Sequence, residues 1–150
     1  MLTAAFWNAN VRDNSTALPR GLVAEDTSTS TQTLVNATNA DITGLTLTTT
    51  FEQNRSYRIT LQVFRGTQQG TLDLFAIIGA TTLDGQITGL PSTSRAEHVF
   101  AEWLYKHTTT TASLTVKGNA TANGVNVTLV NSGGFLPHTL RVFDIGETNF

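Results

Sequence analysis

Most of the chain alternates between apolar and polar side chains with a period of two. The clearest case is residues 57–63, where every second side chain is apolar and the ones between are Arg, Thr and Gln. A strand that buries one face gives this pattern. Further strands are predicted on the same grounds at Gln32–Asn36, Ile42–Phe51, Thr71–Gly79, Leu114–Val116, Val125–Leu129 and Leu140–Gly146.

Turn signals separate these segments. Gly66–Gly70, Asp84-Gly85, Asn123-Gly124 and Gly133-Gly134 are typical of tight connections between strands. Glu97–Lys106 fits either a strand or a short helix, and we favour the strand. About eight strands, with turns about every ten residues, predict an all-β, antiparallel β-sandwich or jelly roll. We expect a loop at Lys117–Ala122, after Leu114 and Val116.

The N-terminal segment has a different pattern. Thr3 is a candidate N-cap for a short helix, in which Trp7 and Val11 would share one face. Leu18-Pro19 would prevent its continuation. Residues 20–31 are small and polar, which indicates an extended arm. The predicted organisation is therefore a helix and docking arm in residues 1–31 and a β-sandwich in residues 32–150.

Charge and composition narrow the classes of partner. Charged residues make up 13% of the chain, the net charge is −2, and only two lysines are present. Because phosphate binding needs clustered Lys and Arg, we expect no nucleic-acid partner. The longest apolar run, near Leu74–Ile78, is too short to cross a membrane, so we expect no membrane insertion. An abundance of Thr suits a β surface that packs against neighbours.

Candidate chemistry is sparse. His98, His107 and His138 do not have metal-ligand spacing, the acids are dispersed, and Cys is absent. We therefore expect a protein that is not an enzyme and has no cofactor or metal. Trp103 and Tyr105 share one strand face, which fits core packing or, alternatively, a sugar-stacking platform.

Residues 79–96 show the weakest periodicity in the chain. Long loops on a rigid β scaffold often carry recognition. This stretch is our candidate for a ligand or partner loop, through Asp84, Gly85, Ser92, Thr93, Ser94 and Arg95.

Two segments resemble proteins of tailed bacteriophages. Thr3–Asn14 is similar to a segment of tail-fibre and minor tail proteins with the pattern T-A-A-x-W-N-x-x-V-R-D-N. Leu136–Gly146 is similar to the closing strand of short phage surface domains, which are small trimeric sandwiches like tumour-necrosis-factor or complement-type heads. The two segments together cover about a sixth of the chain, and the first is the more specific.

The resemblance implies a protein of the virion surface, assembled in the host cytoplasm. It implies a homotrimer that contacts other virion proteins of the tail or the major capsid, and it suggests a host-surface glycan as ligand. The expected role is a tail-fibre or receptor-binding adhesion module. The alternatives are a capsid decoration protein and a free carbohydrate-binding or glycan-active protein. The candidate docking residues are Trp7, Asn8, Val11, Arg12, Asp13 and Asn14.

Overall fold

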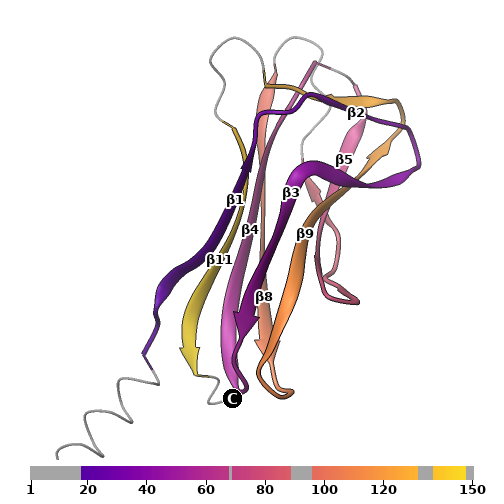
Figure 1. The fold of residues 1–150 in the computed structure, drawn as a ribbon. Helices are drawn as coiled ribbons and strands as arrows, with labels where there is room; N and C mark the ends of the chain where they lie inside the picture. Colours follow the sequence, from indigo (N-terminus) through magenta and orange to yellow (C-terminus); the bar gives the residue numbers. More distant parts are fainter. Residues whose placement is uncertain (1–17, 68, 89–95, 132–136, 148–150) are drawn as a thin grey trace, which may run out of the picture.

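The fold is a sandwich of two antiparallel β-sheets (Figure 1). The computed structural model describes residues 18–67, 69–88, 96–131 and 137–147. The predicted helix near Thr3–Val11 lies outside these residues, whereas the predicted all-β sandwich is confirmed.

Sheet A has six strands, with the order β1-β11-β4-β10-β2 and with β8 paired to β4. Its strands are β1 (Gly21–Ser28), β2 (Gln32–Leu34), β4 (Arg55–Arg65), β8 (Glu97–His107), β10 (Val127–Leu129) and β11 (His138–Glu147). Strands β11 and β8 lie on either side of β4 along most of its length.

Sheet B has five strands, with the order β3-β9-β5-β6 and with β7 also paired to β5. Its strands are β3 (Asn39–Phe51), β5 (Thr71–Ile78), β6 (Thr81–Thr82), β7 (Gln86–Thr88) and β9 (Ala112–Asn123). The long strands of both sheets run between two ends of the sandwich, and we call the end where β1 begins and β11 ends the basal end (Figure 1).

The core lies between the sheets and follows the alternation seen in the sequence. The apolar residues of β4 and β5 that share a face are almost fully buried, as predicted. Glu97–His107 is a strand and its alternate residues enter the core, so the strand interpretation of this segment is confirmed. The inward side chains include Leu45, Leu47, Phe51, Tyr57, Ile59, Leu61, Leu72, Leu74, Val99, Trp103, Val116 and Val142.

Two sequence predictions about irregular segments are wrong. Residues 20–31 are predicted to be an extended arm outside the sandwich, but Gly21–Ser28 pairs with β11 as an edge strand of sheet A. Its side chains are mostly exposed, so backbone pairing and not side-chain burial holds it. The sandwich therefore begins before residue 32, while a docking role for residues 1–17 is not tested by the fold.

The predicted loop at Lys117–Ala122 is instead the middle of β9, which pairs with β3 and β5. Small residues face the core here because the opposite sheet fills the space. A Cβ atom on Gly118 would lie 2.9 Å from Leu61 Cδ1 and 3.4 Å from Leu45 Cβ. The absence of large apolar side chains therefore reflects close packing of the two sheets.

Candidate functional site

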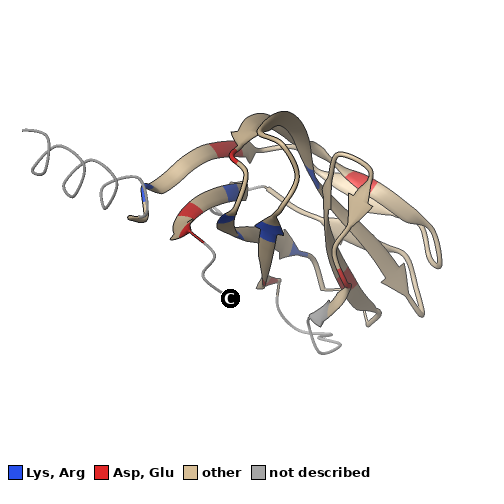
Figure 2. Cartoon of the chain, turned by 90° about the horizontal axis from the view of Figure 1, so that it is seen from below, with Lys and Arg blue, Asp and Glu red and all other residues tan. Residues whose placement is uncertain are grey.

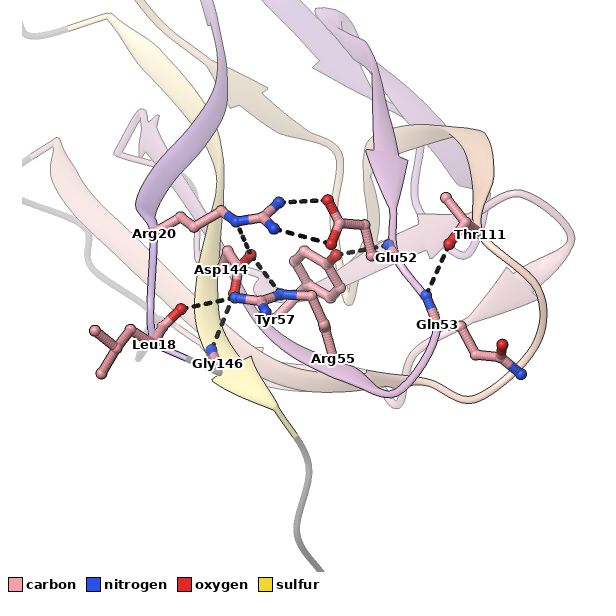
Figure 3. A network of polar contacts seen from close by, with 9 residues as sticks. All are labelled: Leu18, Arg20, Glu52, Gln53, Arg55, Tyr57, Thr111, Asp144 and Gly146. Atoms are coloured by element: carbon pink, nitrogen blue, oxygen red, sulfur yellow. Dashed lines mark hydrogen bonds and ion pairs between the residues drawn. The ribbon is translucent and has the colours of Figure 1, made fainter. Parts of the chain in front are cut away.

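A buried ion pair holds the basal end together (Figure 3). Arg55 at the start of β4 donates to Asp144 near the end of β11, with Nε–Oδ2 at 2.8 Å and Nη2–Oδ1 at 2.7 Å. The two residues are 3% and 1% exposed. The Gly146 N–H donates to Asp144 Oδ1 at 2.9 Å. A bidentate pair with a further backbone donor satisfies a buried carboxylate well.

The same arginine fixes the point where the N-terminal segment joins the sandwich. Arg55 Nη2 donates to the Leu18 carbonyl at 2.8 Å. Two residues on, Arg20 pairs with Glu52, which follows β3, and its Nε lies 3.9 Å from Asp144 Oδ2. These contacts join three segments that are far apart in sequence, namely residues 18–20, the β3–β4 turn and the end of β11 (Figure 3). Residues 18–20 are therefore anchored before β1 begins.

Tyr57 joins this network from the core side. Its hydroxyl accepts the Glu52 N–H at 2.8 Å, which ties the β3–β4 turn to the core. Burial is the main cause that raises the pKa of the Tyr57 hydroxyl above its ordinary value. The Tyr57 side chain therefore stays neutral, and its hydroxyl holds the backbone of Glu52 in place.

One open edge of the sandwich, at β8, is closed by side chains. The Gln86 side chain pairs with both backbone groups of Glu102, accepting its N–H and donating to its carbonyl. Trp103 Nε1 donates to the Asp84 carbonyl at 2.7 Å. Residues 84–86 thus cover the edge where another strand could add.

The other edge, between β1 and β3, is closed in the same way. Asp26 Oδ2 accepts the Thr46 N–H at 2.9 Å, and Ser28 Oγ donates to the Thr43 carbonyl at 2.6 Å. Gly44, with φ at +78°, makes this possible, since a Cβ there would lie 2.7 Å from Ser28 Oγ. Association through strand addition is therefore disfavoured at the β8 edge and at the β1–β3 edge.

The outer face of sheet A carries a continuous row of side chains across four strands. Leu22 pairs with Phe143, Phe143 with Arg58, and Arg58 with Leu104, so the four lie side by side on β1, β11, β4 and β8. We call these four residues the outer row. Leu22 is 50% exposed and Leu104 is 72% exposed. The Arg58 guanidinium lies over the Phe143 ring, 4.5 Å from its centroid, and the other three side chains of the row are apolar.

Charges next to the outer row are neutralised within the sheet. Arg141 pairs with Glu25, and Arg58 Nε lies 3.8 Å from Glu102 Oε2. Phe100, on the same face of β8, is 53% exposed. Charged residues also stand at scattered positions when the molecule is seen from the basal end (Figure 2). The charged side chains named here are paired, so a partner that covers them would not bury an isolated charge.

The outer face of sheet B is different in kind. Thr46, Thr48 and Thr50 are exposed on β3, and Lys117 Nζ contacts Asp41 Oδ2 at 2.8 Å. The hydrogen bond from Lys117 is the main cause that lowers the pKa of the Asp41 carboxyl. Among the residues that the structure describes, β3, β5 and β9 have no large hydrophobic side chain that is strongly exposed. The two faces are therefore chemically distinct.

Two residues of the predicted ligand or partner loop, Asp84 and Gly85, are described, and both contact the sandwich. The Asp84 carbonyl accepts a hydrogen bond from Trp103, and a Cβ atom on Gly85 would clash with the Phe75 ring. Both residues therefore have structural roles. Ser92, Thr93, Ser94 and Arg95 lie outside the described residues, as do the predicted docking residues Trp7, Asn8, Val11, Arg12, Asp13 and Asn14.

Trp103 and Tyr105 belong to the core and are not a sugar platform. Trp103 is 6% exposed, and Tyr105 packs edge-on against Phe51 with ring centroids 5.4 Å apart. The core interpretation from the sequence is confirmed. The same alternation leaves Phe100 and Leu104 on the outside of β8, a signal that sequence reasoning missed.

The three histidines have separate structural partners. His98 Nδ1 contacts Gln62 at 3.0 Å, His107 Nδ1 contacts the Tyr105 hydroxyl at 3.1 Å, and His138 Nδ1 accepts the Phe64 N–H at 3.1 Å. Within the described ranges, no three His, Asp or Glu side chains are grouped so that they could hold a metal ion. In that same part of the chain, no helix has the length and apolar character needed to span a bilayer.

Comparisons with known proteins assign no family. No family model matches the chain, and no curated protein matches it. Among solved structures, the chain aligns with one described as "Structure of infectious bursal disease virus Gx strain", with a TM-score of 0.45 and 11% identity. The alignment covers 87% of this chain and 37% of that one, so this chain spans well under half of that protein's length. Similarity at this level establishes neither a family nor a function.

Proposed function

We propose that the protein is a non-enzymatic structural module of a virus particle, displayed on the virion surface and acting as an oligomer, with a trimer as the expected state. The observation that supports it best is the outer row, which exposes apolar side chains on a sandwich whose β8 edge and β1–β3 edge are closed by side chains. A protein that blocks strand addition but leaves one face apolar is suited to association through that face.

The contacts made by the protein's buried or paired titratable side chains support a structural role. Asp144 binds Arg55, Glu52 binds Arg20, and His138 receives a backbone N–H from β4. Each of these groups joins segments that are distant in sequence. In an active site, such groups would instead converge on a position that a substrate can reach.

The resemblance of Thr3–Asn14 to tail-fibre and minor tail proteins favours a tailed bacteriophage and a tail-fibre or receptor-binding role. In this proposal the particle is assembled in the host cytoplasm, the partners are sister copies and other virion proteins, and the ligand is a host-surface glycan. A capsid decoration protein is the second candidate. The same exposed apolar row could rest on a capsid lattice.

Immunogold labelling of purified particles, with antibody against this chain, tests the proposal. Label at the tail tip or fibres is the expected result and supports adhesion. Label spread over the head would replace adhesion with capsid decoration. Absence of label from particles that contain the gene would contradict a virion role, and the free carbohydrate-binding or glycan-active alternative would then be tested with glycan arrays.

A further inference from the structure

The outer row lacks a covering element within the described part of the chain. It begins at Leu22 on β1 and ends at Leu104 on β8, which is 72% exposed and is the most exposed large hydrophobic residue described. Phe100 extends the apolar surface along β8. Exposed leucine and phenylalanine side chains on one sheet face indicate a surface that a partner covers.

The size of the face limits what can cover it. A patch four strands wide and about five residues long measures roughly 300 Å², given strand spacings of about 4.8 Å and a rise of about 3.3 Å per residue. A stable complex usually buries about 800 Å² on each partner. Two rigid sandwiches meeting only at this row would therefore make a weak contact. A chain segment that belongs to one copy and binds the outer row of another can bind despite the small area, because its tether raises its effective concentration.

The N-terminal segment, residues 1–17, fits this requirement. It carries Leu2, Phe6, Trp7 and Val11 and has few charges. It joins the sandwich at Leu18, four positions before the first residue of the outer row. A segment of this length reaches up to about 55 Å when extended, which is far more than the width of four strands.

The anchoring at the basal end favours a neighbouring copy as the receiver. The Leu18 carbonyl is fixed by Arg55, and Arg20 by Glu52, so the chain has a set direction where it leaves the sandwich. Leu18 precedes Pro19, and a residue before proline is held away from the helical conformation that a tight reversal would use. Folding back onto its own sheet would need a reversal in the residues before Leu18, whereas a neighbouring copy can receive the segment without one.

We propose that residues 1–17 of one copy bind across the outer row of sheet A on a sister copy. The inference rests on the proposed oligomeric role and names the surface and the segment that produce it. Trp7 covers the apolar row, and the tether at Leu18 keeps the segment close to the neighbouring sheet.

Disulfide trapping tests this directly, because the natural chain has no cysteine. Full-length Ala4→Cys protein is mixed with full-length Glu102→Cys protein under mild oxidation. Residue 102 lies between Phe100 and Leu104 on the outer face of β8. The matched control is Thr48→Cys, which is exposed on the outer face of sheet B. We expect at least about tenfold more linked heterodimer with Glu102→Cys than with Thr48→Cys, since tethered groups have a high effective concentration.

A second variant separates docking from folding. Adding Leu104→Asp to the Glu102→Cys protein should remove the trapping while the circular dichroism spectrum stays unchanged, because the side chain is exposed. Equal trapping at residues 102 and 48 would overturn the proposal. So would closure only within single chains that carry both Ala4→Cys and Glu102→Cys.

Light scattering distinguishes this failure from a failure of the proposed function. An oligomer that shows no trapping at residue 102 would overturn the docking of residues 1–17 and leave the oligomeric role standing. A monomer at every concentration would contradict both.

Discussion

At the scale of single residues, the basal end depends on a few polar side chains. Arg55 and Asp144 are 89 residues apart in sequence, and nothing local in either segment indicates that they meet. The sequence therefore could not predict this pair. Its position explains how residues 18–20 are held before the first strand begins.

Asp144→Ala should strongly destabilise the fold, by about 3–5 kcal/mol, because it leaves the buried Arg55 guanidinium without its carboxylate. The matched control is Glu25→Ala, which breaks the exposed pair with Arg141 and should cost less than about 1 kcal/mol. Urea unfolding of both variants measures the difference. Similar losses of stability would show that the buried pair is not the main anchor.

His138 gives the fold a dependence on pH. It is 1% exposed, and its Nδ1 accepts the Phe64 N–H, so the neutral ring is the form that fits. Burial is the main cause that lowers its pKa, and a backbone interaction with Ser30 offsets part of this effect. The unfolded chain therefore binds a proton at a higher pH than the folded chain does. The contribution of neutral His138 to the free energy of unfolding is fully present above the ordinary histidine pKa of about 6.5. It decreases as the pH drops below that value.

His138→Asn should reduce this dependence, because the Asn amide oxygen can accept the same N–H but does not titrate. The expected change is a shallower slope of unfolding free energy between about pH 5 and pH 6.5, where one proton contributes at most about 1.4 kcal/mol per pH unit. Urea titrations at several pH values measure the slope. An unchanged slope in the variant would mean that another group is responsible.

At the scale of elements, alternation was a sufficient guide wherever a strand buries large side chains. It identified β3, β4, β5 and β8 and the faces that they bury. It failed for β1, which pairs through its backbone with its side chains outside. It also failed for the second half of β9, after Val116, where the core-facing residues are small. In both cases the cause lies in a neighbouring strand, which the local sequence does not show.

Gly118→Val tests the explanation for β9. The new side chain would be forced against Leu61 and Leu45, and overpacking of this kind costs about 1–3 kcal/mol. Thr115→Val on the same strand faces outward beside Thr48 and should stay within about 0.5 kcal/mol of the natural protein. Thermal or urea unfolding compares the two. An unchanged free energy of unfolding in Gly118→Val would show that the two sheets are less closely packed at this position.

At the scale of the whole molecule, the two faces of the sandwich differ in chemistry. Sheet B presents threonine hydroxyls, whereas sheet A presents the outer row, and side chains close the edges between them. Sequence reasoning predicted a Thr-rich surface suited to packing but assigned the contacts to Trp7, Asn8, Val11, Arg12, Asp13 and Asn14 and to the loop near Asp84. Locating the outer row required the pairing of four strands, which only the fold provides.

The mass of the full chain in solution, measured by light scattering after size exclusion at micromolar concentration, tests the central claim most directly. The account predicts an oligomer, with three times the chain mass of 16.1 kDa as the expected value. It also predicts dissociation in Leu104→Asp and none in Thr48→Asp. A mass of one chain for the natural protein at every concentration would contradict it.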